Sequence, residues 1–111
     1  MKIAVVYWSG TGNTEMMAKA MAEGVRRIMK SDLALSVTGL AGPDGDDRGN
    51  PVGTVYIGLA APGGTEVTHL VLKGGRESIR QQAADYALAL LNRHLYNSDQ
   101  IAKGENEYGK E

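Results

Sequence analysis

Apolar and polar residues in the first third of the chain follow a pattern that predicts a strand, a helix and a second strand. Residues 2–8 are apolar at both sets of alternating positions, which is typical of a buried strand with a parallel neighbour. Residues 33–38 also show the two-residue period of a strand. Between these runs, apolar residues recur at helical spacing, opposite a charged face, at Met17, Met21, Val25 and Ile28.

The rest of the chain predicts a long loop, two more strands and a second helix. Residues 39–51, GLAGPDGDDRGNP, are rich in glycine, proline, aspartate and asparagine, which is typical of a loop, and loops of this length often carry function. Residues 52–60 and 67–72 are predicted strands, joined by a turn at residues 62–64. Apolar residues at helical spacing then predict a helix over residues 79–95.

This order of elements, β-α-β-β-β-α, predicts one α/β domain over residues 1–96. The first three elements suit a right-handed parallel crossover, and the next two strands suit an antiparallel meander. We therefore expect a mixed four-stranded sheet covered by helices. Residues 97–111 have little apolar content, so we expect them to form a weakly ordered tail.

Composition narrows the classes of function. The 111 residues carry a formal net charge of −1, which gives no electrostatic footprint for nucleic acid or for acidic membranes. With no cysteine and two histidines, the chain has no thiol chemistry, and we expect no metal site. Its apolar start is too short to span a bilayer. We therefore expect a cytoplasmic protein that binds neither nucleic acid nor a membrane.

The sequence SGTGNT, Ser9–Thr14, follows the first predicted strand and opens the first predicted helix. Gly10 and Gly12 let the backbone approach an anion closely, and the N–H groups of a helix start favour one. Hydroxyl and amide side chains are available at Ser9, Thr11, Asn13 and Thr14. The loop lacks the lysine of a Walker A motif. It is interpreted either as a phosphate site or as a tight turn in which Thr14 caps the helix.

Residues 1–24, MKIAVVYWSGTGNTEMMAKAMAEG, resemble the start of a flavodoxin. This resemblance implies that the loop binds the phosphate of FMN through Ser9, Gly10, Thr11, Gly12, Asn13 and Thr14. The chain that follows departs from flavodoxins and lacks the later loops that enclose their flavin ring. Trp8 and Tyr7 are the aromatic residues near the loop, so stacking is limited and we expect FMN to bind weakly.

Most of the remaining sequence resembles the CinA C-terminal domain family. The resemblance runs from about Met17 to Leu95 and rests on LALSVTGLAGPDGDDRGNPVGTVYIGLA and KGGRESIRQQAADYALALL. That family includes amidases that convert the amide of nicotinamide mononucleotide to an acid. The resemblance implies a small phosphate-bearing ligand and a substrate site formed by Thr38, Gly39, Ala41, Gly42, Arg76 and Arg80.

The two arginines of this set admit two interpretations. Arg76 and Arg80 lie at a helix start, where the dipole disfavours cations, so a nearby anion or a paired acid is expected. Solvated surface positions are the alternative interpretation.

Ser9 is the candidate catalytic residue, because YWSGTGN overlays the nucleophile motif of that family, E-S-C-T-G-G. Trp8 stands in place of its glutamate and Gly10 in place of its cysteine. The family segment that carries a tyrosine and an assisting lysine has no counterpart here. A serine is a poor nucleophile without an adjacent base, so we expect amidase activity to be weak or absent.

Three hypotheses of function follow from the two resemblances. The first is an engineered chimera of a flavodoxin-like segment, residues 1–24, and a CinA-like segment, residues 25–96. It would have no catalytic activity and would bind phosphate or FMN weakly. The second is a residual nicotinamide-nucleotide-binding or amidase domain. The third is a self-associating module, a homodimer in which an exposed sheet edge pairs with a second copy.

Overall fold

The computed structural model describes residues 1–9, 14–39 and 53–107 of the chain, and the predicted fold class is confirmed. Each predicted helix and strand is present, in the predicted order. The elements are β1 (Ile3–Ser9), α1 (Glu15–Met29), β2 (Leu33–Gly39), β3 (Thr54–Ala61), β4 (Gly64–Val71) and α2 (Arg76–Glu107).

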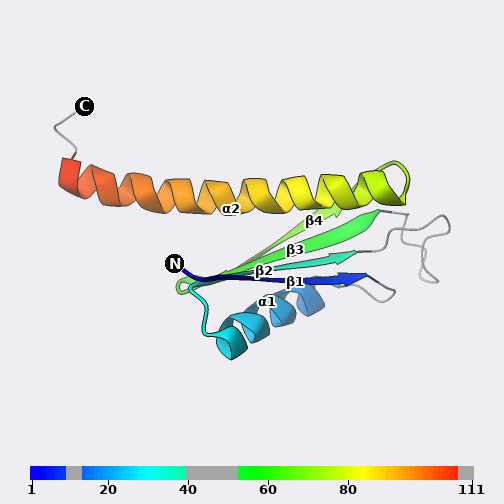
Figure 1. Ribbon diagram of the computed structural model, residues 1–111, viewed down its shortest axis with the longest axis horizontal. Helices are drawn as coiled ribbons and strands as arrows, with labels where there is room; N and C mark the ends of the chain where they lie inside the picture. The colour runs from blue at the N-terminus through cyan, green and yellow to red at the C-terminus, as the bar shows by residue number, and fades with distance from the viewer. Residues whose placement is uncertain (10–13, 40–52, 108–111) are drawn as a thin grey trace.

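The four strands form one mixed sheet in the order β1-β2-β3-β4. β1 pairs with β2 in parallel, and the other two pairs are antiparallel. α1 covers one face of the sheet and α2 the other (Figure 1). Because β1, β2 and β4 run in one direction, they end at the same end of the sheet, where α1 and α2 both begin. We call this the helix-start end.

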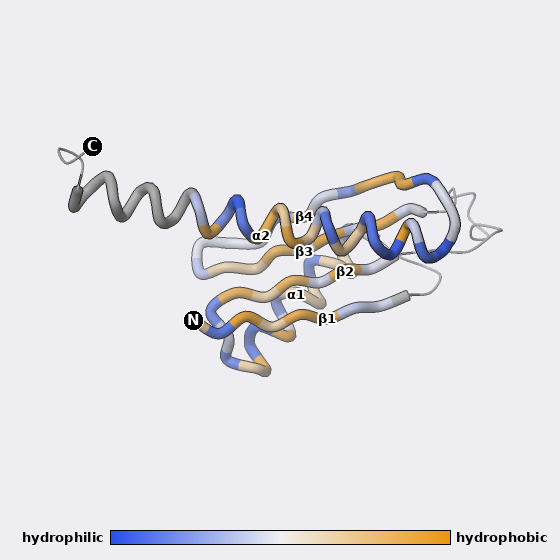
Figure 2. The backbone as a smooth tube through the Cα atoms, turned by 45° about the horizontal axis from the view of Figure 1, so that its top comes forward, coloured by the Kyte–Doolittle hydropathy of each residue, from blue (hydrophilic) through white to orange (hydrophobic). Residues whose placement is uncertain are grey.

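The face of the sheet under α2 holds the larger hydrophobic core. Its buried side chains come from β2, β3, the segment after β4 and α2, and Figure 2 shows hydrophobic colour along the strands. The cluster consists of Leu35, Val37, Val55, Ile57, Leu59, Leu72, Ile79, Ala83 and Ala87. The face under α1 is packed by small residues, Ala4, Ala22, Ala34 and Ala60, with Val25 beside them.

α1 lies close to the sheet because the residues at the contact are small. Ala18 and Ala22 are fully buried. A Cβ atom at Gly58 would lie 2.7 Å from the carbonyl oxygen of Ala18 and 2.7 Å from Oγ of Ser36. The buried Ser36 hydroxyl donates a hydrogen bond of 2.7 Å to that same carbonyl. Backbone of the helix and backbone of the sheet therefore meet with little side chain between them.

This close contact corrects the predicted face of the first helix. We expected Met17, Met21, Val25 and Ile28 to form its buried stripe, but its fully buried residues are Ala18 and Ala22. Ile28 is 76% exposed. The contact leaves space for methyl groups at its centre, so larger side chains lie at its margins or in solvent.

The prediction that the first strand is buried is wrong for its face away from α1 and for Trp8, which is 48% exposed on the other face. β1 does have the expected parallel neighbour, but it is an edge strand. Ile3, Val5 and Tyr7 are 37%, 64% and 49% exposed. The reason is the position of α2, which contacts β2 and β3 and leaves this face of β1 uncovered among the described residues.

The second helix is longer than predicted. Its backbone continues to Glu107, so the predicted end near Leu95 is wrong. Residues 96–107 contain no proline and several good helix formers, so local propensity continues the helix beyond the part that packs on the sheet. The weakly ordered tail predicted for residues 97–111 stays a prediction.

Candidate functional site

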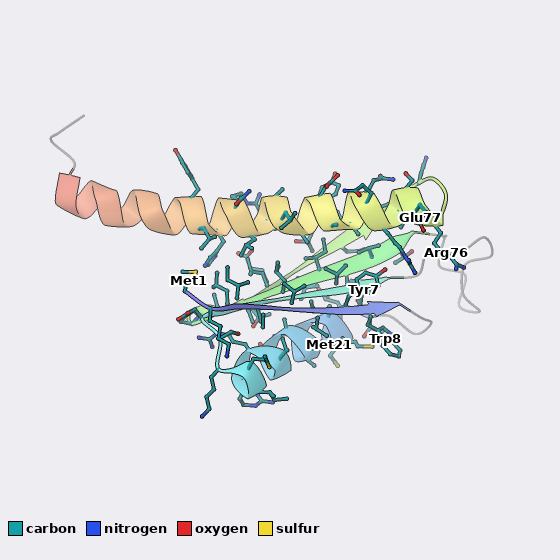
Figure 3. The ribbon with its side chains drawn as sticks, viewed as in Figure 1. Met1, Tyr7, Trp8, Met21, Arg76 and Glu77 are labelled. Atoms are coloured by element: carbon teal, nitrogen blue, oxygen red, sulfur yellow. The ribbon has the colours of Figure 1, made fainter. Side chains whose placement is uncertain are left out.

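The helix-start end brings together the described residues that the sequence singled out. Ser9 closes β1, and its backbone is paired in register with Gly39 at the end of β2. Thr14 caps α1, and Arg76 is the first residue of α2. Figure 3 shows Arg76 at this end of the molecule and Trp8 near the end of β1. The other predicted ligand residues, Gly10, Thr11, Gly12, Asn13, Ala41 and Gly42, lie outside the described residues.

Thr14 performs the capping role that the sequence predicted for it. Its backbone is extended, and its Oγ1 accepts a hydrogen bond of 3.0 Å from the N–H group of Met17. The N–H group of Ala18 donates to the Thr14 carbonyl at 3.1 Å. Because the first N–H groups of a helix lack intrahelical acceptors, those of Glu15 and Met16 are directed toward the helix-start end.

Thr38 and Gly39, the last two residues of β2, are both buried. The Thr38 side chain is fully buried, and its Oγ1 donates to the carbonyl oxygen of Tyr56 at 3.5 Å. A Cβ atom at Gly39 would lie 3.0 Å from Cγ2 of Val55. The Thr38 hydroxyl is thus directed at β3. A residue larger than glycine at position 39 would crowd the Val55 side chain of the same strand.

A row of side chains that the sequence did not connect crosses the sheet at this end. Trp8 is paired in register with Thr38, Thr38 with Tyr56, and Tyr56 with His69, so all four lie on the α1 side. The rings of Tyr56 and His69 are stacked, with centroids 4.6 Å apart and an angle of 11° between their planes. Counting outward from the two-residue turn at Pro62–Gly63 places His69 opposite Tyr56.

Arg76 and Arg80 lie on the first turns of α2, on the other side of the sheet from α1. Both arginines are exposed. Each helix also has an acidic residue in its first turn, Glu15 in α1 and Glu77 in α2. The charges of the two glutamates offset those of the two arginines. Among the described groups, the N-termini of the two helices are therefore the main source of attraction for an anion.

The end of the sheet opposite the helix-start end, at the β3–β4 turn, is hollowed. Hollows of about 330 and 500 Å³ lie there, both lined by Gly63, Gly64 and Thr65 at the β3–β4 turn. None of the predicted site residues that the structure describes lines either hollow. Within the described ranges, no three histidine, cysteine or acidic side chains are grouped to hold a metal ion. Nor does any described helix have the length and apolar character needed to cross a membrane.

Comparison with known proteins identifies the family to which this α/β domain belongs. Residues 8–95 match the family described as the CinA C-terminal domain, and the chain is a member of that family. It is 52% identical over 81 residues to a CinA-like protein of Syntrophomonas wolfei, covering 73% of this chain and 20% of that protein. It is 49% identical over 79 residues to a CinA-like protein of Geobacter sulfurreducens, covering 71% of this chain and 19% of that protein.

Solved structures show the same relationship. A CinA superfamily protein from Enterobacter cloacae superposes with a TM-score of 0.71 at 30% identity, covering 74% of this chain and 48% of that one. The competence/damage inducible protein CihA from Agrobacterium tumefaciens superposes with a TM-score of 0.73 at 20% identity, covering 83% of this chain and 84% of that one. The second likeness supports the fold alone.

The matches also show how much of these relatives the chain represents. It spans about a fifth of the length of the curated relatives and about half of the Enterobacter structure. The family match begins at Trp8, so most of β1 lies before it. None of these findings supports a flavodoxin-like segment or an engineered chimera, and the hypothesis of a chimera is not carried further.

Proposed function

We propose that this chain binds a nicotinamide mononucleotide through its phosphate at the helix-start end and hydrolyses its amide slowly or not at all. The observation that carries the proposal is the pairing of Ser9 with Gly39. It places the residue that overlays the nucleophile of CinA-type amidases beside the start of their TGLAG substrate loop. Membership of the CinA family supports the choice of ligand.

The arrangement of the helices suits a phosphate group. α1 and α2 both begin at this end of the sheet, on opposite faces, so each presents N-terminal N–H groups and a positive dipole end there. Such ends bind anions without a net positive charge. Arg80, exposed one turn into α2, adds a cation that can reach a ligand held there.

The low activity follows from the surroundings of Ser9. A serine nucleophile needs a base within hydrogen-bond reach. His69 lies on β4, three strands from β1, which is roughly 14 Å away at the usual spacing of strands. The Nζ atom of Lys19 instead lies 3.9 Å from Oε2 of Glu23, in an exposed ion pair along α1. Neither of these two residues therefore offers a base beside the end of β1.

Calorimetric titration with matched ligands tests the binding part of the proposal. We expect nicotinamide mononucleotide to bind at least about 10-fold more tightly than nicotinamide riboside, which lacks the phosphate. Arg80→Gln should weaken binding of the nucleotide several-fold. Arg93→Gln should leave it unchanged, since that exposed residue lies roughly 20 Å further along α2. Equal affinity for the two ligands, or no heat with either, would refute a phosphate site.

Ammonia release tests the catalytic part independently. We expect little or no ammonia from nicotinamide mononucleotide, with no difference between the wild type and Ser9→Ala. Rapid release that disappears in Ser9→Ala would show that Ser9 is an activated nucleophile after all. FMN is the competing ligand at the same loop, and the half-exposed Trp8 beside it gives a flavin a surface to stack on. Tighter binding of FMN than of the nicotinamide nucleotide, measured by flavin fluorescence, would favour that ligand.

A further inference from the structure

The edge of β1 that faces away from β2 has no partner strand among the described residues, and it combines exposed apolar side chains with backbone groups that point outward. The carbonyl of Lys2 accepts hydrogen bonds from the β2 side, from the N–H groups of Asp32 and Leu33. Backbone groups of successive strand residues point to alternate sides. The N–H and C=O groups of Ile3, Val5 and Tyr7 therefore point away from β2, and these are the same residues whose side chains are exposed.

β1 also lacks the features that normally keep an edge strand from pairing. Its sequence, IAVVYWS, contains no charged residue, no proline and no glycine over seven residues. The other edge strand, β4, carries Glu66 and an exposed His69. An edge of this length and composition is a template for another strand.

We propose that a second copy of this chain pairs with β1 in antiparallel fashion, about a two-fold axis that passes midway between the two Val5 residues. In this register Ile3 faces Tyr7 of the second copy, Val5 faces Val5, and each facing pair exchanges two hydrogen bonds. It is the register that pairs the three exposed residues entirely with one another. The interface is isologous and closed, so it forms dimers rather than filaments.

The position of α2 is compatible with this pairing. The helix contacts β2 and β3, so its axis lies about one and a half strand spacings from β1. In the dimer the two α2 axes would be roughly 19 Å apart, which leaves a channel about 10 Å wide between helices of normal diameter. The six side chains of Ile3, Val5 and Tyr7 from both copies fill that channel.

The size of the surface sets the expected strength. The exposed parts of the three side chains offer roughly 300 Å² per copy, to which the strand edge adds backbone contacts. A standard stable interface buries about 800 Å² per partner. Because standard interfaces range from micromolar to picomolar affinity, we expect this smaller one to give a concentration-dependent dimer with a dissociation constant weaker than micromolar, on the order of 10–100 µM. This inference is independent of the proposed ligand.

Sedimentation equilibrium from roughly 5 µM to 1 mM tests the proposal, since this range brackets the expected dissociation constant. The wild type should change from monomer to dimer. Val5→Lys and Val5→Glu should each be monomeric throughout, because like charges meet on the two-fold axis. Val71→Lys, the matched control on the exposed end of β4, should dimerise like the wild type.

Mixing the two charged variants separates pairing at this site from a general effect on folding. Lysine and glutamate would then face each other on the axis, so an equimolar mixture of Val5→Lys and Val5→Glu should form heterodimers. A wild type that stays monomeric at 1 mM, a Val5→Lys variant that dimerises normally, or a mixture that stays monomeric would each overturn the proposal.

Discussion

Gly58→Ala should destabilise the fold, because α1 lies too close to the sheet at this position for a methyl group. The added Cβ atom would lie 2.7 Å from the Ala18 carbonyl oxygen and from Oγ of Ser36, well inside the roughly 3.5 Å of a favourable contact. Both atoms are fixed, the first in a helix backbone and the second in a buried hydrogen bond. Either α1 moves outward or the hydrogen bond breaks.

The magnitude follows from these two effects. Overpacking of a core typically costs 1–3 kcal/mol, and loss of the Ser36–Ala18 hydrogen bond costs about 1 kcal/mol more. Replacing glycine by alanine recovers about 0.5–1 kcal/mol through the unfolded chain. We therefore expect the free energy of unfolding to fall by about 2 kcal/mol, and the melting temperature to fall by roughly 10 °C.

Urea unfolding followed by circular dichroism measures this change, with Gly24→Ala as the matched control. Nothing lies within 4 Å of the Cβ position at Gly24, in the middle of α1, so alanine there should stabilise the protein by up to about 1 kcal/mol. The same substitution should thus have opposite signs at the two sites. A Gly58→Ala variant as stable as the wild type would show that α1 is not seated on the sheet in this way.

Three further substitutions test other parts of the fold, each by the same unfolding assay. Thr14→Ala should lower the free energy of unfolding by about 1 kcal/mol, because it removes the acceptor for the Met17 N–H group; no change would mean that water replaces the cap fully. Gly53→Ala should cost at least about 2 kcal/mol, because Gly53 has a φ of +89° and its Cβ would overlap the carbonyl of Leu72; a stable variant would contradict that backbone geometry. Ile79→Ala should cost about 2–5 kcal/mol, because this side chain of α2 is 1% exposed where the helix packs on the sheet; a cost below about 1 kcal/mol would show that α2 packs loosely.

The order and type of the elements could be predicted from the sequence because each element has a clear period. The parallel pairing of β1 followed from its two apolar faces, but local sequence does not reveal which strand lies at an edge. That property depends on where α2 packs. Likewise, the buried face of α1 is set by Gly58 and the alanines of distant strands, so Ala18 and Ala22 gave a weaker signal than the neighbouring methionines.

The candidate site could be predicted in part. The proximity of Ser9 and Gly39 follows once the first two strands are placed side by side in parallel. The row that ends in the Tyr56–His69 stack depends on the length of the β3–β4 turn. A turn that is one residue longer or shorter would move His69 to the other face of the sheet. The nearness of Arg76 to this end depends on α2 starting there, which follows from the direction of β4.

Amide chemical shifts of the labelled protein, measured during titration with nicotinamide mononucleotide, test the central claim most directly. A phosphate held at the helix-start end should shift most strongly the amides of Gly39 and of the helix start that binds it, Glu15 or Glu77, and nicotinamide riboside at the same concentration should shift them much less. Shifts centred on Thr65 at the opposite end, or no shifts at millimolar nucleotide, would contradict the claim.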